Sequence, residues 1–304
     1  MSKIRIVTRR SALAMAQTEH VANQLSRIHP DLVCEIVPMV TRGDKILDVA
    51  LSKVGGKGLF VSELEQALLD HRADIAVHSL KDVPGELADG LTIGAVPLRE
   101  DPRDAVIMRQ DLDWDSLQKG SVVGTSSLRR QAQLRALRPD LKFDTLRGNI
   151  DTRLSKVDEG NLSAIILAAA GLNRLGRRDR ISKLLDPAEC LPAVGQGALG
   201  IECRYDEEVL KWLEPLSHEP TKRETDAERT LLQQLNGGCQ VPIAGFAVTL
   251  PSGEIWLRGF VSDVDGREAW HAEASGHDPV DLGQGVAQKL LDMGAHKALS
   301  GWTE

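Results

Sequence analysis

Arginine and hydroxyl side chains gather where predicted strands give way to predicted helices. The three stretches are Thr8-Arg9-Arg10-Ser11, Gly124-Thr125-Ser126-Ser127-Leu128-Arg129-Arg130, and Arg147-Gly148-Asn149 with Arg153. A helix N-terminus offers unpaired backbone N–H groups to an anion, and a guanidinium adds a bidentate fork for carboxylate or phosphate. The first stretch is explained equally well by Ser11 as the N-cap of the helix at Ala12–Ile28, beside exposed arginines. The three stretches together favour a ligand with several anionic groups. The pattern does not distinguish phosphate from carboxylate groups.

Two other segments carry groups that could react. Asp82 follows a predicted buried strand, where a fixed carboxylate could stabilise developing positive charge; an exposed turn paired with Lys81 is the simpler alternative. Cys239 follows two glycines, which places a thiol on an accessible loop, although most free cysteines are inert small hydrophobic residues. No histidine or Ser–His–Asp partner is recognisable beside Cys239, so a cysteine-dependent hydrolase or transferase is disfavoured.

A glycine-rich segment, Val54–Gly58, precedes a predicted helix. It lacks the spacing and the Lys-Ser/Thr ending of a P-loop. A nucleotide site is therefore disfavoured, and a mobile flap or an ordinary loop remains. The four cysteines lie far apart without zinc-ligand spacing, so we expect no metal site.

Composition limits the partners and the compartment. Hydrophobic residues make up 42% of the 304 residues and charged residues 27%, an ordinary globular balance. Aromatic residues are only 3% and the net charge is -7, which disfavours a base-stacking nucleic-acid surface and a general affinity for polyanions. The N-terminus lacks the apolar stretch of a signal peptide, and no long apolar run is present. We expect a cytoplasmic monomer with reduced thiols and no membrane partner.

The hydrophobic pattern alternates between strand and helix periods through the first two thirds of the chain. The first part predicts strands at Lys3–Thr8, Leu32–Val40, Asp74–Ser79 and Leu91–Val96, with helices at Ala12–Ile28 and Leu59–Asp70. The second predicts strands at Ala105–Met108, Ser121–Gly124, Lys142–Thr145 and Ser163–Ala168, with helices at Leu128–Arg138 and Ile150–Asp158. Such alternation is typical of largely parallel sheets covered by helices.

The last third changes to successive strands between two helices. The predicted elements are a helix at Thr225–Leu235, strands at Ala244–Leu250, Glu254–Val261 and Glu268–Ala274, and a helix at 279–298. The predicted fold is therefore α/β: two hinged lobes like those of periplasmic binding proteins, plus a small C-terminal α+β domain with an antiparallel sheet. The crossings at Pro97–Arg103 and Leu191–Gly200 place the domains at 1–97 with 198–215, 103–191, and 218–304.

The motifs, in this order, resemble the porphobilinogen deaminase (hydroxymethylbilane synthase) family. The matching segments are Thr8–Ala14, Val54–Phe60, His78–Pro84, Glu100–Ala105, Gly124–Gln131, Leu146–Leu154, Pro192–Arg204 and Gly237–Ala244. They are spread over most of residues 8–244. Beyond about Gly245 the likeness is one of length and general pattern only.

The resemblance implies a transferase of tetrapyrrole (haem) biosynthesis. Its reaction condenses four porphobilinogen units head to tail, releases ammonia from each, and gives hydroxymethylbilane. Its cofactor is one dipyrromethane per chain, thioether-linked to the cysteine of the Gly-Gly-Cys loop, here Cys239. Each substrate unit carries an acetate and a propionate, which suits the arginine-rich turns.

The resemblance also assigns roles by motif position. Asp82 matches the catalytic carboxylate, as an acid or as an electrostatic stabiliser of the electron-poor azafulvene and the pyrrole cation. The cofactor is expected to contact Cys239, Ser79, Lys81, Asp82, Thr125, Ser126, Ser127, Arg129, Arg130, Arg147 and Gly148. The substrate is expected to contact Arg9, Ser11, Phe60, Arg153, Arg174 and Gln196, under a flap that carries Lys53 and Lys57.

A different class of protein explains part of the pattern. A non-catalytic, two-lobed anion-binding protein or sensor domain accounts for the lobes and the arginines. It does not account for the Gly-Gly-Cys loop or the third domain. A covalent adduct on Cys239 would distinguish the two interpretations.

Overall fold

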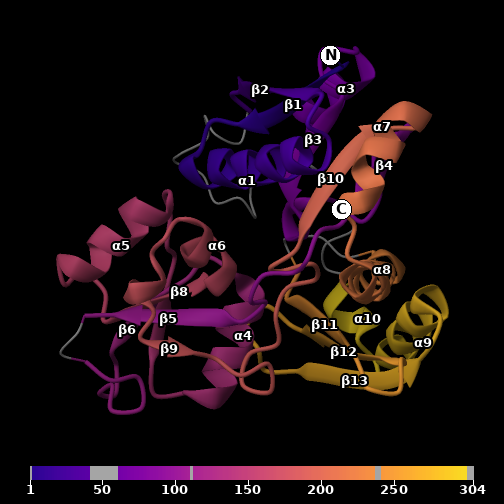
Figure 1. Cartoon of the computed structure of the whole chain (residues 1–304). Helices are drawn as coiled ribbons and strands as arrows, with labels where there is room; N and C mark the ends of the chain where they lie inside the picture. The colour runs from indigo at the N-terminus through magenta and orange to yellow at the C-terminus, as the bar shows by residue number, and fades with distance from the viewer. Residues whose placement is uncertain (1, 42–60, 110–111, 237–240, 300–304) are drawn as a thin grey trace. The chain divides into compact units, whose positions relative to one another are not determined.

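The computed structural model describes residues 2–41, 61–109, 112–236 and 241–299. The chain separates into two compact units, each built from two stretches of sequence. Unit 1 is Met1–Glu100 with Ala198–Arg223, and unit 2 is Asp101–Gly197 with Glu224–Glu304. Figure 1 colours these stretches by residue number.

Unit 1 contains a mixed five-stranded sheet in the order β2-β1-β3-β10-β4. The strands are β1 (Ser2–Arg9), β2 (Leu32–Met39), β3 (Ile75–Ser79), β4 (Leu91–Ala95) and β10 (Leu199–Arg204). β1 runs parallel to β2 and β3, whereas β10 runs antiparallel to β3 and β4. The strand that completes this sheet therefore comes from far along the chain.

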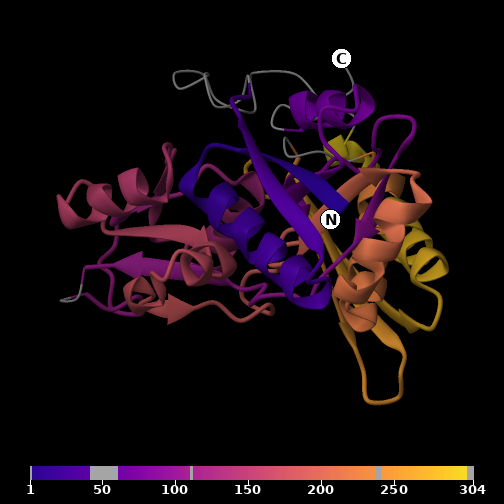
Figure 2. The same cartoon turned by 45° about the horizontal axis from the view of Figure 1, so that its top comes forward.

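Helices cover both faces of this sheet because neighbouring strand residues point to opposite faces. α1 (Ala12–Ile28) packs on the face of Ile6, with α7 (Glu207–Leu213), and α3 (Ser62–Leu69) packs on the face of Val7. Figure 2 shows α1 lying against the strands of the N-terminal segment. The apolar period of Val21 and Leu25, both fully buried, turns one face of α1 to the core.

Unit 2 begins with a second mixed five-stranded sheet in the order β7-β6-β8-β5-β9. Its strands are β5 (Asp104–Met108), β6 (Val122–Gly124), β7 (Lys142–Asp144), β8 (Ala164–Ala168) and β9 (Lys183–Leu184). β6 is parallel to β7 and β8, and β5 is antiparallel to β8 and β9. α4 (Leu128–Leu137) covers one face, and α5 (Ile150–Asp158) and α6 (Ala169–Arg174) cover the other.

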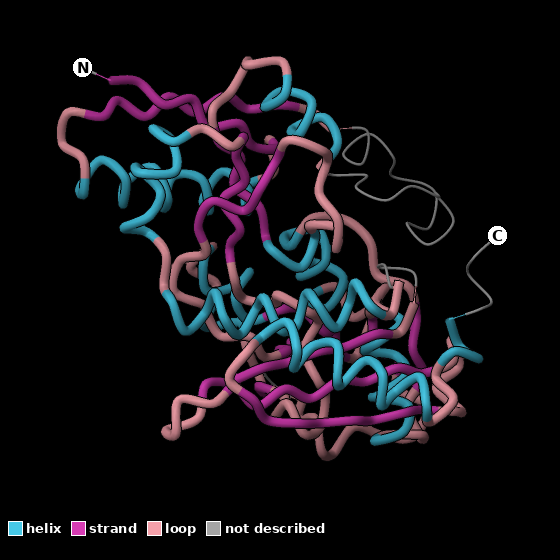
Figure 3. Tube along the Cα trace, turned by 90° about the vertical axis from the view of Figure 1, so that its right-hand side faces the viewer, coloured by secondary structure: helices cyan, strands magenta, loops and turns pink. Residues whose placement is uncertain are grey.

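The rest of unit 2 is a three-stranded antiparallel sheet, β11 (Ile243–Thr249), β12 (Ile255–Ser262) and β13 (Ala269–Gly276). α8 (Glu219–Gln234) and α9 (Pro279–Asp292) lie on one face of it, as Figures 1 and 3 show. At Gly259 an added Cβ would meet Leu231 of α8 and Leu290 of α9. On the opposite face Phe260 packs with Ala132 of α4.

The predicted fold is confirmed as two α/β lobes and a small antiparallel C-terminal domain. The helices Ala12–Ile28 and Ile150–Asp158 have the predicted bounds. The sheets of the two lobes are largely parallel, as predicted, and in each of them one strand, β10 or β5, runs against its neighbours. The final helix is two helices, since Gly294 adopts φ +106 and separates α9 from α10 (His296–Leu299).

Some elements were absent from the prediction. α8 begins at Glu219 rather than Thr225, and its first turns are polar on most sides. The short elements β9, α6 and α7 were also missed. No helix in the part of the chain that the structure describes has the length and apolarity to cross a membrane.

Candidate functional site

In unit 1 the predicted residues meet at one edge of the sheet. β1 and β3 are adjacent and parallel, so their carboxyl ends lie at the same edge. Arg9 is the last residue of β1 and Ser79 the last of β3. Ser11 is the N-cap of α1, as predicted, and its Oγ accepts a hydrogen bond from the Ala14 backbone N–H at 3.3 Å. This edge therefore carries one cation and two hydroxyls.

Asp82 extends the same edge. It ends a 3-10 turn, Leu80–Asp82, directly after β3, and its side chain is exposed. Gln17 of α1 donates from Nε2 to Ser79 Oγ at 2.8 Å and fixes that hydroxyl. Lys81 is partly buried beside Asp82. The carboxyl group is thus presented to solvent from a short turn on a buried strand.

In unit 2 three turns open onto one edge of the sheet. β6, β7 and β8 are parallel, so the segments after them emerge at the same edge. These segments are Thr125–Ser127, Arg147–Asn149 and helix α6, which ends at Arg174. Asp104, which begins the antiparallel strand β5, is the register partner of Ala168 and therefore lies at this edge as well.

The start of α4 lacks a side-chain cap. Ser127 is its N-cap residue, but the hydroxyl forms no capping bond to the helix. Ser126 Oγ instead bonds with the backbone of Leu146, and Thr125 Oγ1 accepts from the Ser127 backbone N–H at 3.3 Å. The hydroxyls therefore shape the turn, and the first N–H groups of a ten-residue helix keep no side-chain cap from Ser127.

The turn after β7 requires its glycine. Gly148 has φ +103, and an added Cβ would lie 2.8 Å from Thr152. Asn149 caps α5 by accepting from the Thr152 N–H at 2.8 Å. Arg153 donates from Nε to the Gly148 carbonyl at 2.7 Å. Arg147 and Arg153 are both partly buried at this turn.

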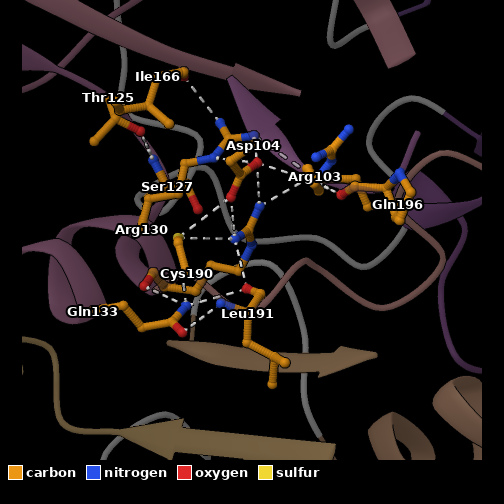
Figure 4. Close-up of polar contacts among 12 residues, drawn as sticks. Arg103, Asp104, Thr125, Ser127, Arg130, Gln133, Ile166, Cys190, Leu191 and Gln196 are labelled. Atoms are coloured by element: carbon orange, nitrogen blue, oxygen red, sulfur yellow. Dashed lines mark hydrogen bonds and ion pairs between the residues drawn. The ribbon is translucent and has the colours of Figure 1, made fainter. Parts of the chain in front are cut away.

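Arg129 and Arg130 both contact the buried carboxylate of Asp104, which the sequence analysis did not single out. Figure 4 shows Arg130 beside Asp104. Arg129 contacts Asp104 through Nη1 at 2.6 Å and Nη2 at 3.0 Å. Arg130 contacts the same carboxylate through Nη2 at 2.7 Å and Nε at 3.1 Å. Asp104 is 0% exposed and the two arginines 5% and 7%. The pair is therefore held inside unit 2 from the first turn of α4.

Gln196 completes this cluster. Its Nε2 donates to Asp104 Oδ1 at 2.8 Å and to the Pro102 carbonyl at 2.7 Å, and its Oε1 accepts from Arg129 Nη2 at 3.0 Å. Gln196 is fully buried. Arg174 donates to the neighbouring Gly197 carbonyl at 2.7 Å. We use "the Asp104 cluster" for Asp104, Arg129, Arg130 and Gln196.

The contacts within the Asp104 cluster shift the pKa values of Asp104 and of the neighbouring Cys190. Burial alone would raise the pKa of Asp104, but the charges and hydrogen bonds of Arg129 and Arg130 outweigh burial and hold that pKa well below its usual value. Burial and the nearby Asp104 raise the pKa of the Cys190 thiol to about 12. Asp104 is thus an anion, and Cys190 is a neutral thiol that donates to Asp104 at 3.4 Å.

Four predicted residues, Cys239, Lys53, Lys57 and Phe60, lie outside the described residues. Asp104 is a polar group of this site that the sequence analysis missed. Asp104 precedes the apolar run Ala105–Met108, and a charged residue at the start of a buried strand was the available signal. Among the described residues no group of His, Cys, Asp and Glu side chains could hold a metal ion.

Comparison with known proteins covers nearly the whole chain. Residues 4–211 match the family described as "Porphobilinogen deaminase, dipyromethane cofactor binding domain", and residues 222–292 match its C-terminal domain. The chain is 54% identical to a porphobilinogen deaminase of Chromobacterium violaceum, covering 99% of this chain and 98% of that one. It is 52% identical to one of Bacillus velezensis, covering 98% and 96%.

Solved structures give a weaker likeness. A methionine-binding lipoprotein of Bacillus subtilis is 12% identical with a TM-score of 0.43, and covers 71% of this chain and 90% of its own. A substrate-binding domain of a molybdenum transporter from Clostridium difficile is 12% identical with a TM-score of 0.43, and covers 73% and 95%.

Proposed function

This chain belongs to the porphobilinogen deaminase family, and from that premise we propose which of its residues hold the cofactor and carry the reaction. It is a transferase with a dipyrromethane cofactor. It condenses four porphobilinogen units head to tail, releases ammonia from each, and yields hydroxymethylbilane. The cofactor is linked as a thioether to Cys239, and porphobilinogen is the substrate.

The donors in unit 2 fit a ligand of this kind. A dipyrromethane built from two substrate units carries several carboxylates. The first N–H groups of α4, which Ser127 does not cap, supply donors for these carboxylates, and the two guanidiniums on the first turn, held by the single carboxylate of Asp104, add net positive charge. This arrangement is the observation that carries the proposal. When bound, the dipyrromethane supplies the nucleophilic pyrrole carbon to which substrate is added.

The remaining roles follow the two sheet edges. Asp82, exposed beyond β3, stabilises the positive charge that develops on the substrate as ammonia leaves, or donates a proton to the departing amine. The cofactor contacts are Ser79, Lys81, Asp82, Thr125, Ser126, Ser127, Arg129, Arg130, Arg147 and Gly148. The substrate contacts are Arg9, Ser11, Phe60, Arg153 and Arg174, with Lys53 and Lys57 on a flap. Gln196, predicted as a further substrate contact, is fully buried and acts instead through its bonds to Asp104 and Arg129.

For the whole chain we propose three domains, 1–97 with 198–215, 103–191, and 218–304, that work as a cytoplasmic monomer. The net charge of -7 supports the absence of a nucleic-acid partner. Sedimentation of the purified protein tests the oligomeric state. A species of about the 33.1 kDa chain mass is expected, and a stable dimer would contradict it.

The intact mass of the denatured protein tests the covalent anchor. We expect the mass of the chain plus two pyrrole units, and the bare chain mass in Cys239→Ser. Cys34→Ser is the matched control, because Cys34 is a partly exposed thiol of unit 1 and should keep the adduct. If the active protein without substitutions has the mass of the chain alone, the proposal is contradicted. A bare mass without activity is the result expected of a non-catalytic anion-binding protein.

A further inference from the structure

Asp104 accepts hydrogen bonds from two guanidiniums, an amide and a thiol. Four guanidinium contacts reach it from Arg129 and Arg130, at 2.6, 2.7, 3.0 and 3.1 Å. Gln196 Nε2 adds a contact at 2.8 Å, and Cys190 Sγ one at 3.4 Å. Every one of these groups is buried. The carboxylate therefore fixes the orientation of both guanidiniums together.

The two guanidiniums would not share this place without Asp104. Like charges repel, and burial strengthens the repulsion because the local dielectric is low. One carboxylate between two guanidiniums leaves a single net positive charge. The Arg129 guanidinium is also held by the Leu191 carbonyl at 2.9 Å, and that of Arg130 by the Ile166 carbonyl at 3.2 Å. Both guanidiniums are thus oriented before any ligand arrives, and these contacts leave Arg129 Nε–H and one N–H of Arg130 Nη1 for a ligand.

We propose that Asp104 is a positioning residue of the reaction. It orients Arg129 and Arg130 and reduces their joint charge to a single positive one, and the pair so arranged binds a carboxylate of an acidic pyrrole ligand. This role rests on the function proposed above. Gln196 acts with Asp104, since its amide bonds both the carboxylate and Arg129. Asp104 itself contacts guanidiniums and not the ligand.

Two variants separate the charge of Asp104 from its position. Asp104→Asn keeps the shape and removes the charge, so two buried guanidiniums face each other. Asp104→Glu keeps the charge and moves the carboxylate by one methylene. Protein free of the cofactor is incubated with porphobilinogen, and the intact denatured mass gives the rate at which the adduct forms. The steady-state KM and kcat are measured on the loaded fraction.

We expect adduct formation in Asp104→Asn to slow about 10- to 100-fold, the scale of effect that misplaced binding groups produce. In Asp104→Glu we expect adduct formation to continue and KM for porphobilinogen to rise about tenfold, with a smaller change in kcat. Asp101→Asn is the control, because Asp101 pairs with Arg103 at 2.7 Å in the same segment, but outside the Asp104 cluster and in a partly exposed place. It should load and bind like the unchanged protein.

Each result decides the role of Asp104. Unchanged adduct formation and KM in both variants, even with a lower melting temperature, would reduce Asp104 to a structural ion pair and overturn the inference. If Asp104→Asn does not fold, the KM of Asp104→Glu decides alone. An adduct missing from the unchanged protein would contradict the proposed function, and with it the ligand assigned to these arginines.

Discussion

Glu228 of α8 accepts a hydrogen bond from the backbone N–H of Gly195 at 2.7 Å, although the two residues are 33 positions apart. Its other carboxylate oxygen accepts from the Ala247 backbone N–H of β11 at 2.8 Å. One fully buried side chain therefore joins the C-terminal sheet to the segment that carries Gln196. α8, the helix that precedes Cys239 in the sequence, is thus connected through Gly195 to Gln196 of the Asp104 cluster.

Replacing Glu228 should weaken this connection. Glu228→Gln keeps the size but leaves one buried backbone N–H facing an amide NH₂, so we expect a loss of about 1–3 kcal/mol in the free energy of unfolding. Urea titration measures it. Glu224→Gln is the control, since Glu224 accepts from the Thr249 N–H at 2.8 Å in a less buried place. A loss no larger than that of the control would contradict the prediction.

Asp82→Asn should fold and lose turnover. The amide cannot stabilise a cation as a carboxylate does, and we expect kcat to fall about 10²- to 10⁴-fold with the cofactor adduct still present. Initial rates and the intact mass measure the two effects. Asp89→Asn removes another exposed carboxylate a few residues away and should be nearly unchanged. Near-normal turnover in Asp82→Asn would remove that residue from its role.

Asp74 should make the stability of unit 1 sensitive to acid. Burial alone would raise the pKa of Asp74, but the hydrogen bonds and charge of Arg5, with Arg204, outweigh burial and lower that pKa. Because the folded pKa is depressed, the stabilisation is full above the unfolded value of about 3.9 and is lost as the pH falls through the folded pKa.

The variant Asp74→Asn tests this sign. Its deficit in the free energy of unfolding should be largest near pH 7 and shrink as the pH falls from about 4 to about 2. Urea titrations across this range measure it. Asp70→Asn, which breaks an exposed pair with Arg72, should show a smaller deficit throughout. A deficit for Asp74→Asn that does not change with pH would refute the assignment.

The turn between β12 and β13 should not tolerate a side chain at Gly266. Gly266 has φ +71, and an added Cβ would lie 2.8 Å from the Ala132 Cα and 2.9 Å from its carbonyl oxygen, both backbone atoms of α4. Gly253 has φ +83 with nothing within 4 Å, so Gly253→Ala carries only the cost of the left-handed backbone, about 1–2 kcal/mol. We expect Gly266→Ala to lose about 1–3 kcal/mol more.

Thermal or urea unfolding of these two glycine variants isolates the contact between α4 and the C-terminal sheet. Equal losses would mean that the turn moves away from α4 without resistance. A larger loss in Gly266→Ala would show that α4, which bears Arg129 and Arg130, is supported from the sheet side. The comparison needs no assumption about the cost of the left-handed backbone, because both glycines share it.

Local signals in the sequence were sufficient for most elements. The apolar period of Val21 and Leu25 and the hydroxyl of Ser11 defined α1, because capping and amphipathicity depend on neighbours within a few residues. The turns with Thr125 and Arg147 were also placed correctly after their strands. These features are set by short-range chemistry.

What was missed depends on contacts between distant segments. Nothing near Leu199–Arg204 indicates that this strand runs antiparallel between β3 and β4. The ion pairs of Arg129 and Arg130 depend on Asp104, which is 25 and 26 residues away. Sequence reasoning assigned both arginines to a ligand, whereas the structure shows that they also share an internal carboxylate.

The placement of β10 has a consequence for synthesis on the ribosome. β10 lies between β3 and β4, yet it follows the whole second lobe in the chain. At about 5–20 residues per second, β4 waits roughly 5–20 s after it is made before its pairing partner emerges. During that interval the nascent first lobe exposes two unpaired strand edges, so folding of the N-terminal sheet is completed after translation of the second lobe.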